Sequence, residues 1–136
     1  MHPESTGDLL MAAARALRRR HSAVLAGWDV TPAQGRALKL VVALDGPRNS
    51  VLAERLRIAP RSATEVVDAL ASRGLVERRP DPSDRRATTV VATDAGRELL
   101  TVVERARRWE SERFLAGLTA DDRRELHRIL GALADG

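Results

Sequence analysis

The stretch VLAERLRIAPRSATEVVDALASRGLVERRPDPSDRRATTVVAT, residues 51–93, decides the fold of this chain. Apolar residues recur in its first half at spacings of three and four, which predicts two short amphipathic helices. Ile58-Ala59-Pro60 interrupts the pattern between them, and Pro60 suits the first turn of a new helix, where its missing N–H leaves no hydrogen bond unmade. Two short helices joined so tightly must cross at a steep angle. The stretch therefore predicts a helix-turn-helix, whose second helix can enter the major groove of DNA.

The second half of the same stretch predicts a charged β-hairpin. Gly74 is placed to end the second helix, and segments 75–79 and 87–91 have the β-branched, alternating character of strands. The segment 80–84 between them has turn chemistry, because proline fixes φ and Asp and Ser side chains bond to their own backbone. Side chains two apart on a strand share a face, so Asp84 is expected to contact Arg86 and hold it extended. Arginines presented in this way suit a narrow minor groove.

At these residues the chain resembles the MarR family of winged-helix transcriptional regulators. The resemblance is carried by LAERL at 52–56, GLVERRPDPSDRR at 74–86 and VVATDAG at 90–96, and it extends in order and spacing over nearly the whole chain. The last segment looks like the family's strand-to-helix LTxxG signature, with Thr93 capping the next helix and Gly96 in its first turn. The resemblance implies a mainly helical α+β fold: a winged helix-turn-helix with a β-hairpin wing, flanked by N- and C-terminal helices that form a dimerisation domain.

Helices are expected on both sides of this module. One over 9–28 places leucines and Trp28 on a single face. Thr31 is the expected N-cap of a second helix, with proline as its first residue. After the wing, 94–116 read as a long helix, and Thr119 is the expected cap of a last one that begins with carboxylates.

The terminal helices carry more apolar residues than a small winged helix could cover, so their expected destination is a second copy of the chain. We read residues 1–136 as one domain with a DNA-binding lobe at 30–93 and a helical dimerisation lobe at 8–28 and 94–134. A two-fold dimer is also what such a protein needs to read two half-sites about 34 Å apart. Residues 48–50 are one fewer than the family's pattern has there, which leaves open whether a small first wing strand forms.

Composition narrows the alternatives. The chain length suits one domain with a core, and the 2% aromatic content is low for a protein that binds single strands by stacking. With no cysteine, disulfides and the thiol redox switch of some MarR-like regulators are excluded. No apolar run has the length of a membrane span, and Met1-His2-Pro3-Glu4 lacks a signal-peptide pattern. The expected location is therefore the cytoplasm, away from any membrane.

Charge supports a nucleic-acid partner only in part. The formal net charge is +4, and Lys39 is the one lysine among 23 basic residues. The excess lies in the N-terminal part, because residues 61–97 carry seven basic and six acidic side chains. Charge alone therefore does not identify the reading module, and the preference for arginine can equally reflect genome composition.

Polar residues on the outer face of the second helix are the candidates for reading DNA. Arg61, Ser62, Thr64 and Glu65 lie in its N-terminal half, the part that meets base edges. Arg61 can read guanine in bidentate fashion, Ser62 and Thr64 can bond a phosphate or a base, and Glu65 can accept from a cytosine amino group. The alternative is an ordinary exposed face with a local ion pair between Glu65 and Arg61. Arg57 occupies a turn that usually has glycine, at a cost of about 1 kcal/mol.

In the wing, Arg78, Arg79, Arg85 and Arg86 are candidates for phosphate and minor-groove contacts, with Asp84 as a brace. Arg86 is the favoured minor-groove residue because it shares a strand face with Asp84. The alternative is that Asp84 and Arg86 only hold the hairpin together.

By resemblance, the function implied is that of a homodimeric repressor that binds a pseudo-palindromic operator in double-stranded DNA. A small, often aromatic or anionic, ligand would bind between the DNA-binding lobes and the dimer helices and shift the lobe spacing. The sequence does not identify the residues of such a pocket; Arg15, His21 and Trp28 are only polar or amphipathic positions on the first helix. The competing hypothesis is a winged-helix module that binds another protein, as the near-neutral module and Glu65 allow.

An enzyme is not expected. His2, His21 and His127 are scattered without metal-ligand spacing, and the chain has no Gly-rich phosphate loop and no GxSxG motif. The sequence therefore predicts no catalytic residues, no cofactor and no metal site.

Overall fold

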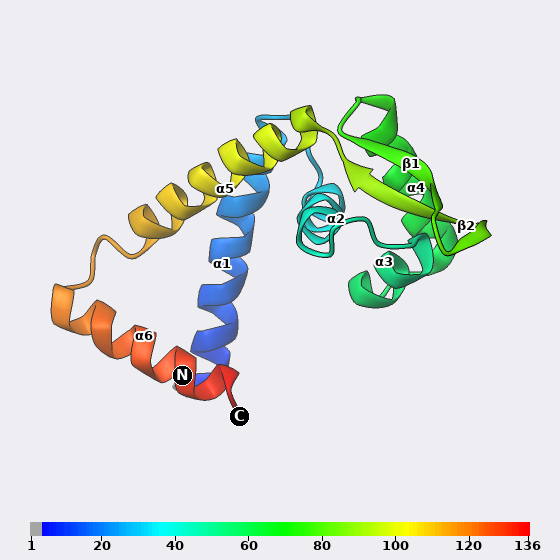
Figure 1. Ribbon diagram of the computed structural model, residues 1–136. Helices are drawn as coiled ribbons and strands as arrows, with labels where there is room; N and C mark the ends of the chain where they lie inside the picture. The colour runs from blue at the N-terminus through cyan, green and yellow to red at the C-terminus, as the bar shows by residue number, and fades with distance from the viewer. Residues whose placement is uncertain (1–3) are drawn as a thin grey trace.

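The computed structural model describes residues 4–136, which form six helices and one antiparallel pair of strands (Figure 1). The helices are α1 (Thr6–Ala26), α2 (Pro32–Ala43), α3 (Asn49–Leu56), α4 (Pro60–Ser72), α5 (Asp94–Phe114) and α6 (Ala120–Ala134); the strands are β1 (Val76–Asp81) and β2 (Asp84–Ala92). This order confirms the predicted winged-helix fold. Residues 1–3 of the N-terminal segment, His2 among them, lie outside the described part of the chain.

Side-chain caps begin several helices where the sequence predicts them. The hydroxyls of Thr31, Thr93 and Thr119 each accept a hydrogen bond from a backbone N–H in the first turn of α2, α5 and α6. Thr31 also forms a capping box with Gln34, with hydrogen bonds of 3.1 and 3.2 Å. Such a cap contributes about 1 kcal/mol to the stability of its helix. These starts were predictable because each depends on two or three neighbouring residues.

The main hydrophobic core lies between α2, α3, α4 and the sheet. A second, smaller cluster of Leu25, Val30 and Val103 joins α1 to α5. Val67 and Leu70 are buried as the helical spacing predicts, so α4 turns its opposite face to solvent. The main cluster consists of Ala37, Leu38, Val41, Leu52, Val67, Leu70, Leu75, Val76 and Val90.

The turn between α3 and α4 is built as expected. Arg57 has φ 56° and ψ 46°, the left-handed conformation that usually selects glycine. Pro60 is the first residue of α4. After α4, Gly74 has φ 72°, and a Cβ there would meet nothing within 4 Å. The positive φ, rather than a lack of space, is therefore the reason for glycine at this position.

The wing differs in detail from its prediction. β1 begins at Val76, one residue later than predicted, but ends at Asp81, and β2 extends beyond 87–91 at both ends. Only Pro82 and Ser83 therefore lie between the strands, and the predicted turn over 80–84 is too long. Pro80 pairs with Thr88 inside the hairpin, a position that an outer strand of a sheet tolerates. Within residues 4–136 the sheet has two strands; the segment before α3 adds only a single bridge, Arg48 to Thr89.

Gly96 lets α5 begin directly against the wing. A Cβ at this position would lie 2.0 Å from the carbonyl oxygen of Leu75, a contact that no side chain can make. The Thr93 hydroxyl donates to the carbonyl of Gly74 at 2.6 Å and accepts from the Gly96 amide at 3.1 Å. The Thr93-to-Gly96 segment therefore fixes the long helix to the end of α4 and the start of β1.

The helices α1, α5 and α6 enclose an open triangle (Figure 1). α1 begins earlier than predicted and ends at Ala26, so Trp28 lies in the following turn rather than on the helix. No residue of α6 is buried. Large apolar side chains on these helices are exposed, up to 67% for Trp109 and 60% for Leu133. Among residues 4–136, no helix has the length and apolar character needed to cross a membrane.

Candidate nucleic-acid interface and anion pocket

The exposed face of α4 presents Arg61 and Glu65 to solvent. Their side chains are 93% and 72% exposed, and Arg61 Nε lies 4.0 Å from Glu65 Oε1. The local ion pair considered for Glu65 is therefore present, but a pair of this kind contributes only about 0.2–0.5 kcal/mol. Such a weak contact leaves the Arg61 guanidinium able to turn toward a base edge.

Thr64 and Ser62 are less freely presented. The Thr64 hydroxyl donates to the carbonyl of Pro60 at 3.0 Å and accepts from Asn49 Nδ2 at 3.3 Å. Ser62 is half-buried. The hydrogen bond between Thr64 and Asn49 thus joins the first turn of α4 to the start of α3. The sequence pattern did not indicate this role for Asn49.

Arg78 and Arg79 of β1 are both engaged in ion pairs. Arg78 Nη2 lies 2.6 Å from Asp68 Oδ1 and also donates to the Thr64 carbonyl at 3.4 Å. Arg79 pairs with Glu77 on its own strand at 3.2 Å. Through these two contacts Arg78 links strand β1 of the wing to α4.

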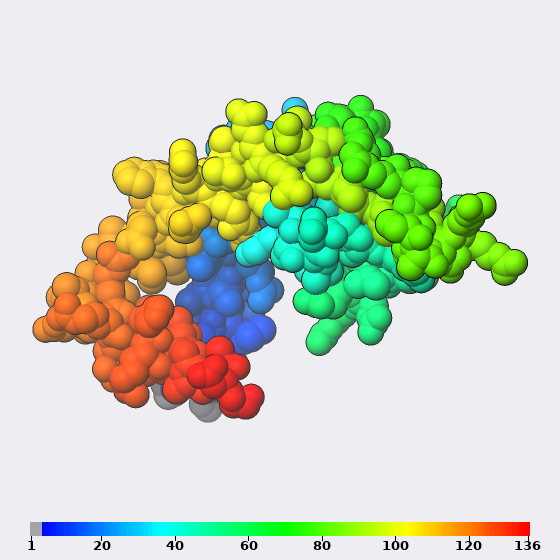
Figure 2. All heavy atoms as spheres, in the orientation of Figure 1, coloured from blue at the N-terminus to red at the C-terminus, as the bar shows by residue number. Residues whose placement is uncertain are grey.

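Arg85 and Arg86 project from a bulge in β2. Strand pairing passes from Pro80 opposite Thr88 directly to Asp81 opposite Asp84, so three residues of β2 have no partner on β1. These three residues are Arg85, Arg86 and Ala87. The bulge lies at the wing tip, which stands out from the rest of the surface (Figure 2).

The contact expected between the side chains of Asp84 and Arg86 is not the one observed. Asp84 Oδ1 accepts instead from the backbone N–H of Arg86 at 3.0 Å. The carboxylate therefore holds the backbone of the bulge, and within residues 4–136 the guanidinium groups of Arg85 and Arg86 have no ion-pair partner. Alternating strand geometry predicts a shared face, but it does not apply to a bulged segment.

A second, unpredicted contact ties the wing to α3. Arg48 Nε and Nη2 both lie 2.6 Å from Asp81 Oδ2. Asp81 Oδ1 accepts from the Ser83 amide at 2.9 Å and from its hydroxyl at 2.8 Å. These bonds from Ser83, and then those from Arg48, hold the pKa of Asp81 below its usual value. Arg48 and Asp81 are 33 positions apart, so no local spacing could have indicated the pair.

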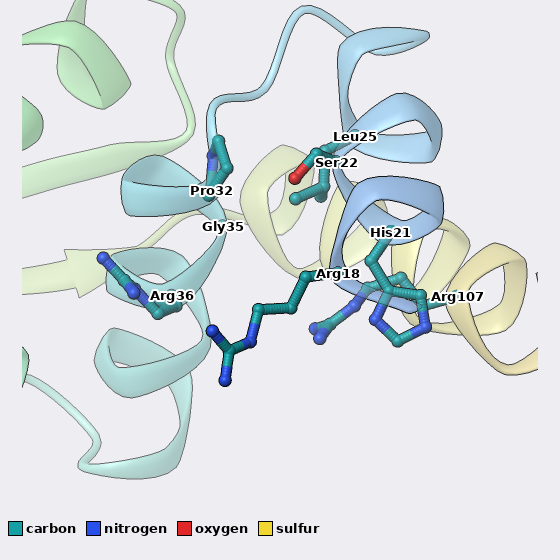
Figure 3. Close-up of a pocket in the computed structure, with 8 residues that line it drawn as sticks. All are labelled: Arg18, His21, Ser22, Leu25, Pro32, Gly35, Arg36 and Arg107. Atoms are coloured by element: carbon teal, nitrogen blue, oxygen red, sulfur yellow. The ribbon is translucent and has the colours of Figure 1, made fainter. Parts of the chain in front are cut away.

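A pocket of about 260 Å³ opens between α1, α2 and α5 (Figure 3). Arg18 reaches from α1 toward α2, on which Arg36 stands. Within the described part of the chain, no carboxylate lines the pocket, although Arg107 pairs with Glu104 at 3.2 Å; Arg18 and Arg36 therefore supply the charge that favours an anion. The lining residues are Arg18, His21, Ser22, Leu25, Pro32, Gly35, Arg36 and Arg107.

The surroundings of His21 in this pocket favour its uncharged form. Burial, and after it the charge of Arg107, lowers the pKa of His21 below its usual value. Its Nε2 lies 2.9 Å from the hydroxyl of Ser111. Arg107 contributes a buried Nε that has no hydrogen-bond partner within residues 4–136. The sequence did not identify pocket residues; of the three polar or amphipathic positions named on the first helix, only His21 lines this pocket.

Comparison with known proteins gives one family. A model of the MarR family matches residues 30–88. An HTH-type transcriptional regulator of Mycobacterium tuberculosis is 42% identical over 73 residues, which are 53% of this chain and 50% of the relative. The aligned part of this chain thus spans about half the length of that relative. The HTH-type transcriptional repressor Rv2887 of Mycobacterium tuberculosis is 30% identical over 127 residues, covering 93% of this chain and 91% of the repressor.

Solved structures agree with the fold. Wild-type MarR of E. coli superimposes with a TM-score of 0.88 at 23% identity, covering 98% of each chain. The Mycobacterium tuberculosis MarR family protein Rv2887 in complex with DNA has a TM-score of 0.83 at 28% identity, covering 96% of this chain and 98% of that one. The same Rv2887 protein has also been solved in complex with p-aminosalicylic acid, and that structure has a TM-score of 0.77.

Proposed function

Because the chain belongs to the MarR family, we propose that it is a transcriptional repressor that binds a pseudo-palindromic operator in double-stranded DNA as a homodimer. One observation carries the proposal. Arg61 on the outer face of α4 is an exposed guanidinium group, and so are Arg85 and Arg86 on the bulge of the hairpin, which contacts α4 through β1. Arginine suits both the edge of guanine in the major groove and a narrow minor groove.

In the major groove, the proposal gives each residue of the α4 face a role. Arg61 reads a guanine edge in bidentate fashion, and Glu65 accepts from a cytosine amino group on the same side of the helix. Ser62 and Thr64 bond a phosphate or a base. Thr64 accepts from a base amino group through the lone pair that Asn49 leaves open, and it donates to a phosphate only when its hydroxyl turns away from the Pro60 carbonyl. The exposure of Arg61 and Glu65 supports this assignment.

In the wing, Arg86 enters the minor groove and Arg85 contacts the adjacent phosphates. Asp84 keeps its role as a brace, acting on the backbone of the bulge rather than on a guanidinium group. Arg78 and Arg79, which are already paired with carboxylates, contribute weaker phosphate contacts from the side of the hairpin. The ion pairs of Arg78 with Asp68 and of Arg79 with Glu77 support this ranking, because a paired guanidinium group is less available to a phosphate.

The dimer brings two such interfaces to one duplex. In the proposal, residues 30–93 form the DNA-binding lobe, whereas residues 8–28 and 94–134 form the dimerisation lobe. The exposed apolar faces of α1, α5 and α6 support this division, because within the described residues of one chain nothing covers them.

The pocket between α1, α2 and α5 is the proposed ligand site. Its arginines and the apolar side chain of Leu25 suit a small aromatic carboxylate, and p-aminosalicylic acid, which the similar Rv2887 protein binds, is the natural probe. The pocket joins helices of the two proposed lobes. A ligand that separates α2 from α1 would favour a lobe spacing that no longer matches the half-sites.

The test is a salt series of binding to the DNA that flanks the protein's own coding region, with a random duplex as control. We expect specific binding that weakens by about a thousandfold between 50 and 200 mM salt, because several phosphate contacts displace counterions. Arg61→Ala should change the base preference, and Arg86→Ala should weaken binding. Equal and weak binding of both duplexes would contradict the proposal and favour a protein partner instead.

A further inference from the structure

Asp81 is the point at which the wing tip is attached to the rest of the protein. It ends β1, directly beside the bulge that carries Arg85 and Arg86. One of its oxygens is taken by Arg48 and the other by Ser83. Its side chain is only 11% exposed, although it lies near the end of a projecting hairpin. The carboxylate is therefore saturated by internal bonds and is not available to another partner.

Arg48 holds Asp81 from a firmly placed backbone. It is the N-cap residue of α3 and forms a bridge to Thr89 of β2. The preceding residue, Pro47, accepts a hydrogen bond from the Val90 amide at 2.8 Å. One side of the bulge is thus anchored by the backbone around Arg48, and the other side is anchored by its side chain through Asp81.

We propose that Arg48 is a positioning residue that sets where the wing arginines lie relative to α4; the inference rests on the proposed DNA-binding function. In this proposal Arg48 acts through Asp81, which engages two of its nitrogens, rather than through a DNA contact of its own. A two-stranded hairpin is marginally stable on its own in water. Without this link the bulge can move relative to the recognition helix, and the register between major-groove and minor-groove contacts is lost.

The proposal makes Arg48 a determinant of minor-groove specificity. Exchanging a G·C pair for inosine·cytosine removes only the guanine N2 amino group, so it changes the minor groove and leaves the major-groove pattern intact. A duplex selected from a random pool by the wild-type protein provides the starting site. The exchange is made at the outer positions of each half-site, under the wing, and separately at the positions under α4.

Wild-type protein should favour inosine over guanine under the wing by about tenfold. Arg48→Met should reduce this ratio to near one while keeping the base preference under α4, and Asp81→Asn should do the same. In an Arg86→Ala background, Arg48→Met should cause no further loss, because both changes remove the same contact. Arg55→Met, which removes an exposed arginine from the same helix, is the matched control and should retain the ratio.

Each outcome is decisive. An unchanged ratio in both Arg48→Met and Asp81→Asn, or losses that add in the Arg86→Ala background, would overturn the positioning role. Specific binding by wild-type protein with no preference for inosine under the wing would overturn it as well. If the wild type selects no sequence at all, the DNA-binding proposal fails first. Thermal unfolding of each variant identifies a misfolded one, and Asp81→Asn then replaces Arg48→Met as the primary variant.

Discussion

At the scale of single residues, Gly96 is the position with the least room for change. A Cβ would lie 2.0 Å from a backbone oxygen of Leu75, and backbone cannot rotate away as a side chain can. Gly96→Ala must therefore push α5 away from β1, and we expect the free energy of unfolding to fall by about 1–3 kcal/mol.

Urea denaturation measures this loss. Gly131→Ala is the control, because a Cβ there meets nothing within 4 Å and alanine favours the interior of α6. That variant should be unchanged or more stable by about 0.5–1 kcal/mol. Equal effects of the two substitutions would show that the contact with Leu75 does not limit the packing of α5.

The residues that sequence reasoning placed correctly are those whose environment is local. Thr31, Thr119 and Pro60 act on neighbours within a few positions, so their types and spacing were enough. The Arg48 to Asp81 pair was not predictable, because it joins residues that only the completed fold brings together. The same holds for the pocket arginines, which come from three separate helices.

At the scale of elements, the end of α4 is joined to the turn between α1 and α2. The Arg73 guanidinium donates to the carbonyl of Asp29 at 2.8 Å and to that of Trp28 at 2.9 Å. Asp29 has φ 55°, a left-handed conformation that costs about 1 kcal/mol for a residue other than glycine. Because the turn continues into Pro32, which lines the pocket, Arg73 connects the recognition helix to the proposed ligand site.

Removing this connection should loosen the turn without disturbing the core. We expect Arg73→Ala to lower the free energy of unfolding by about 1 kcal/mol, because two hydrogen bonds to exposed carbonyls are lost. Amide hydrogen exchange should become faster in residues 27–31 and stay unchanged in the main core. Arg97→Ala, which removes an exposed arginine from α5, serves as the control. Unchanged exchange in the turn would mean that other contacts hold it.

The residue types at the wing tip predicted where the hairpin reverses but not where its strands end. A proline-aspartate-proline-serine-aspartate run is turn chemistry, and the hairpin does reverse within it. The strands extend into this run for two reasons. A two-stranded sheet tolerates Pro80 in one of its strands, and the hydrogen bonds from Ser83 to Asp81 limit the reversal to two residues. Turn propensity therefore located the reversal but not the bulge, because the bulge depends on how the whole of β2 pairs with β1.

At the scale of the whole molecule, the helices near the two ends of the chain leave large apolar side chains exposed. α6 leaves α5 and returns toward the start of α1, and the three helices leave an open space between them (Figure 1). Leu130 and Leu133 are 41% and 60% exposed, and Ile129 is 42% exposed. Burying apolar surface contributes about 25 cal/mol per Å², so two copies that cover these faces for each other gain substantially from association.

Charging this surface should therefore dissociate the dimer. We expect wild-type protein to sediment at twice the chain mass of 14.9 kDa at micromolar concentration. The double variant Ile129→Glu with Leu133→Glu should sediment as a monomer, because it places two charges on one apolar face of α6. A monomer can contact only one half-site, so its affinity for a full operator should fall toward that for an isolated half-site.

Ala120→Glu is the control: it adds a carboxylate to the first turn of the same helix, where the helix dipole favours it, and the variant should remain dimeric. A monomeric wild-type protein, or a double variant that still sediments as a dimer, would contradict a mode of assembly that depends on this face of α6.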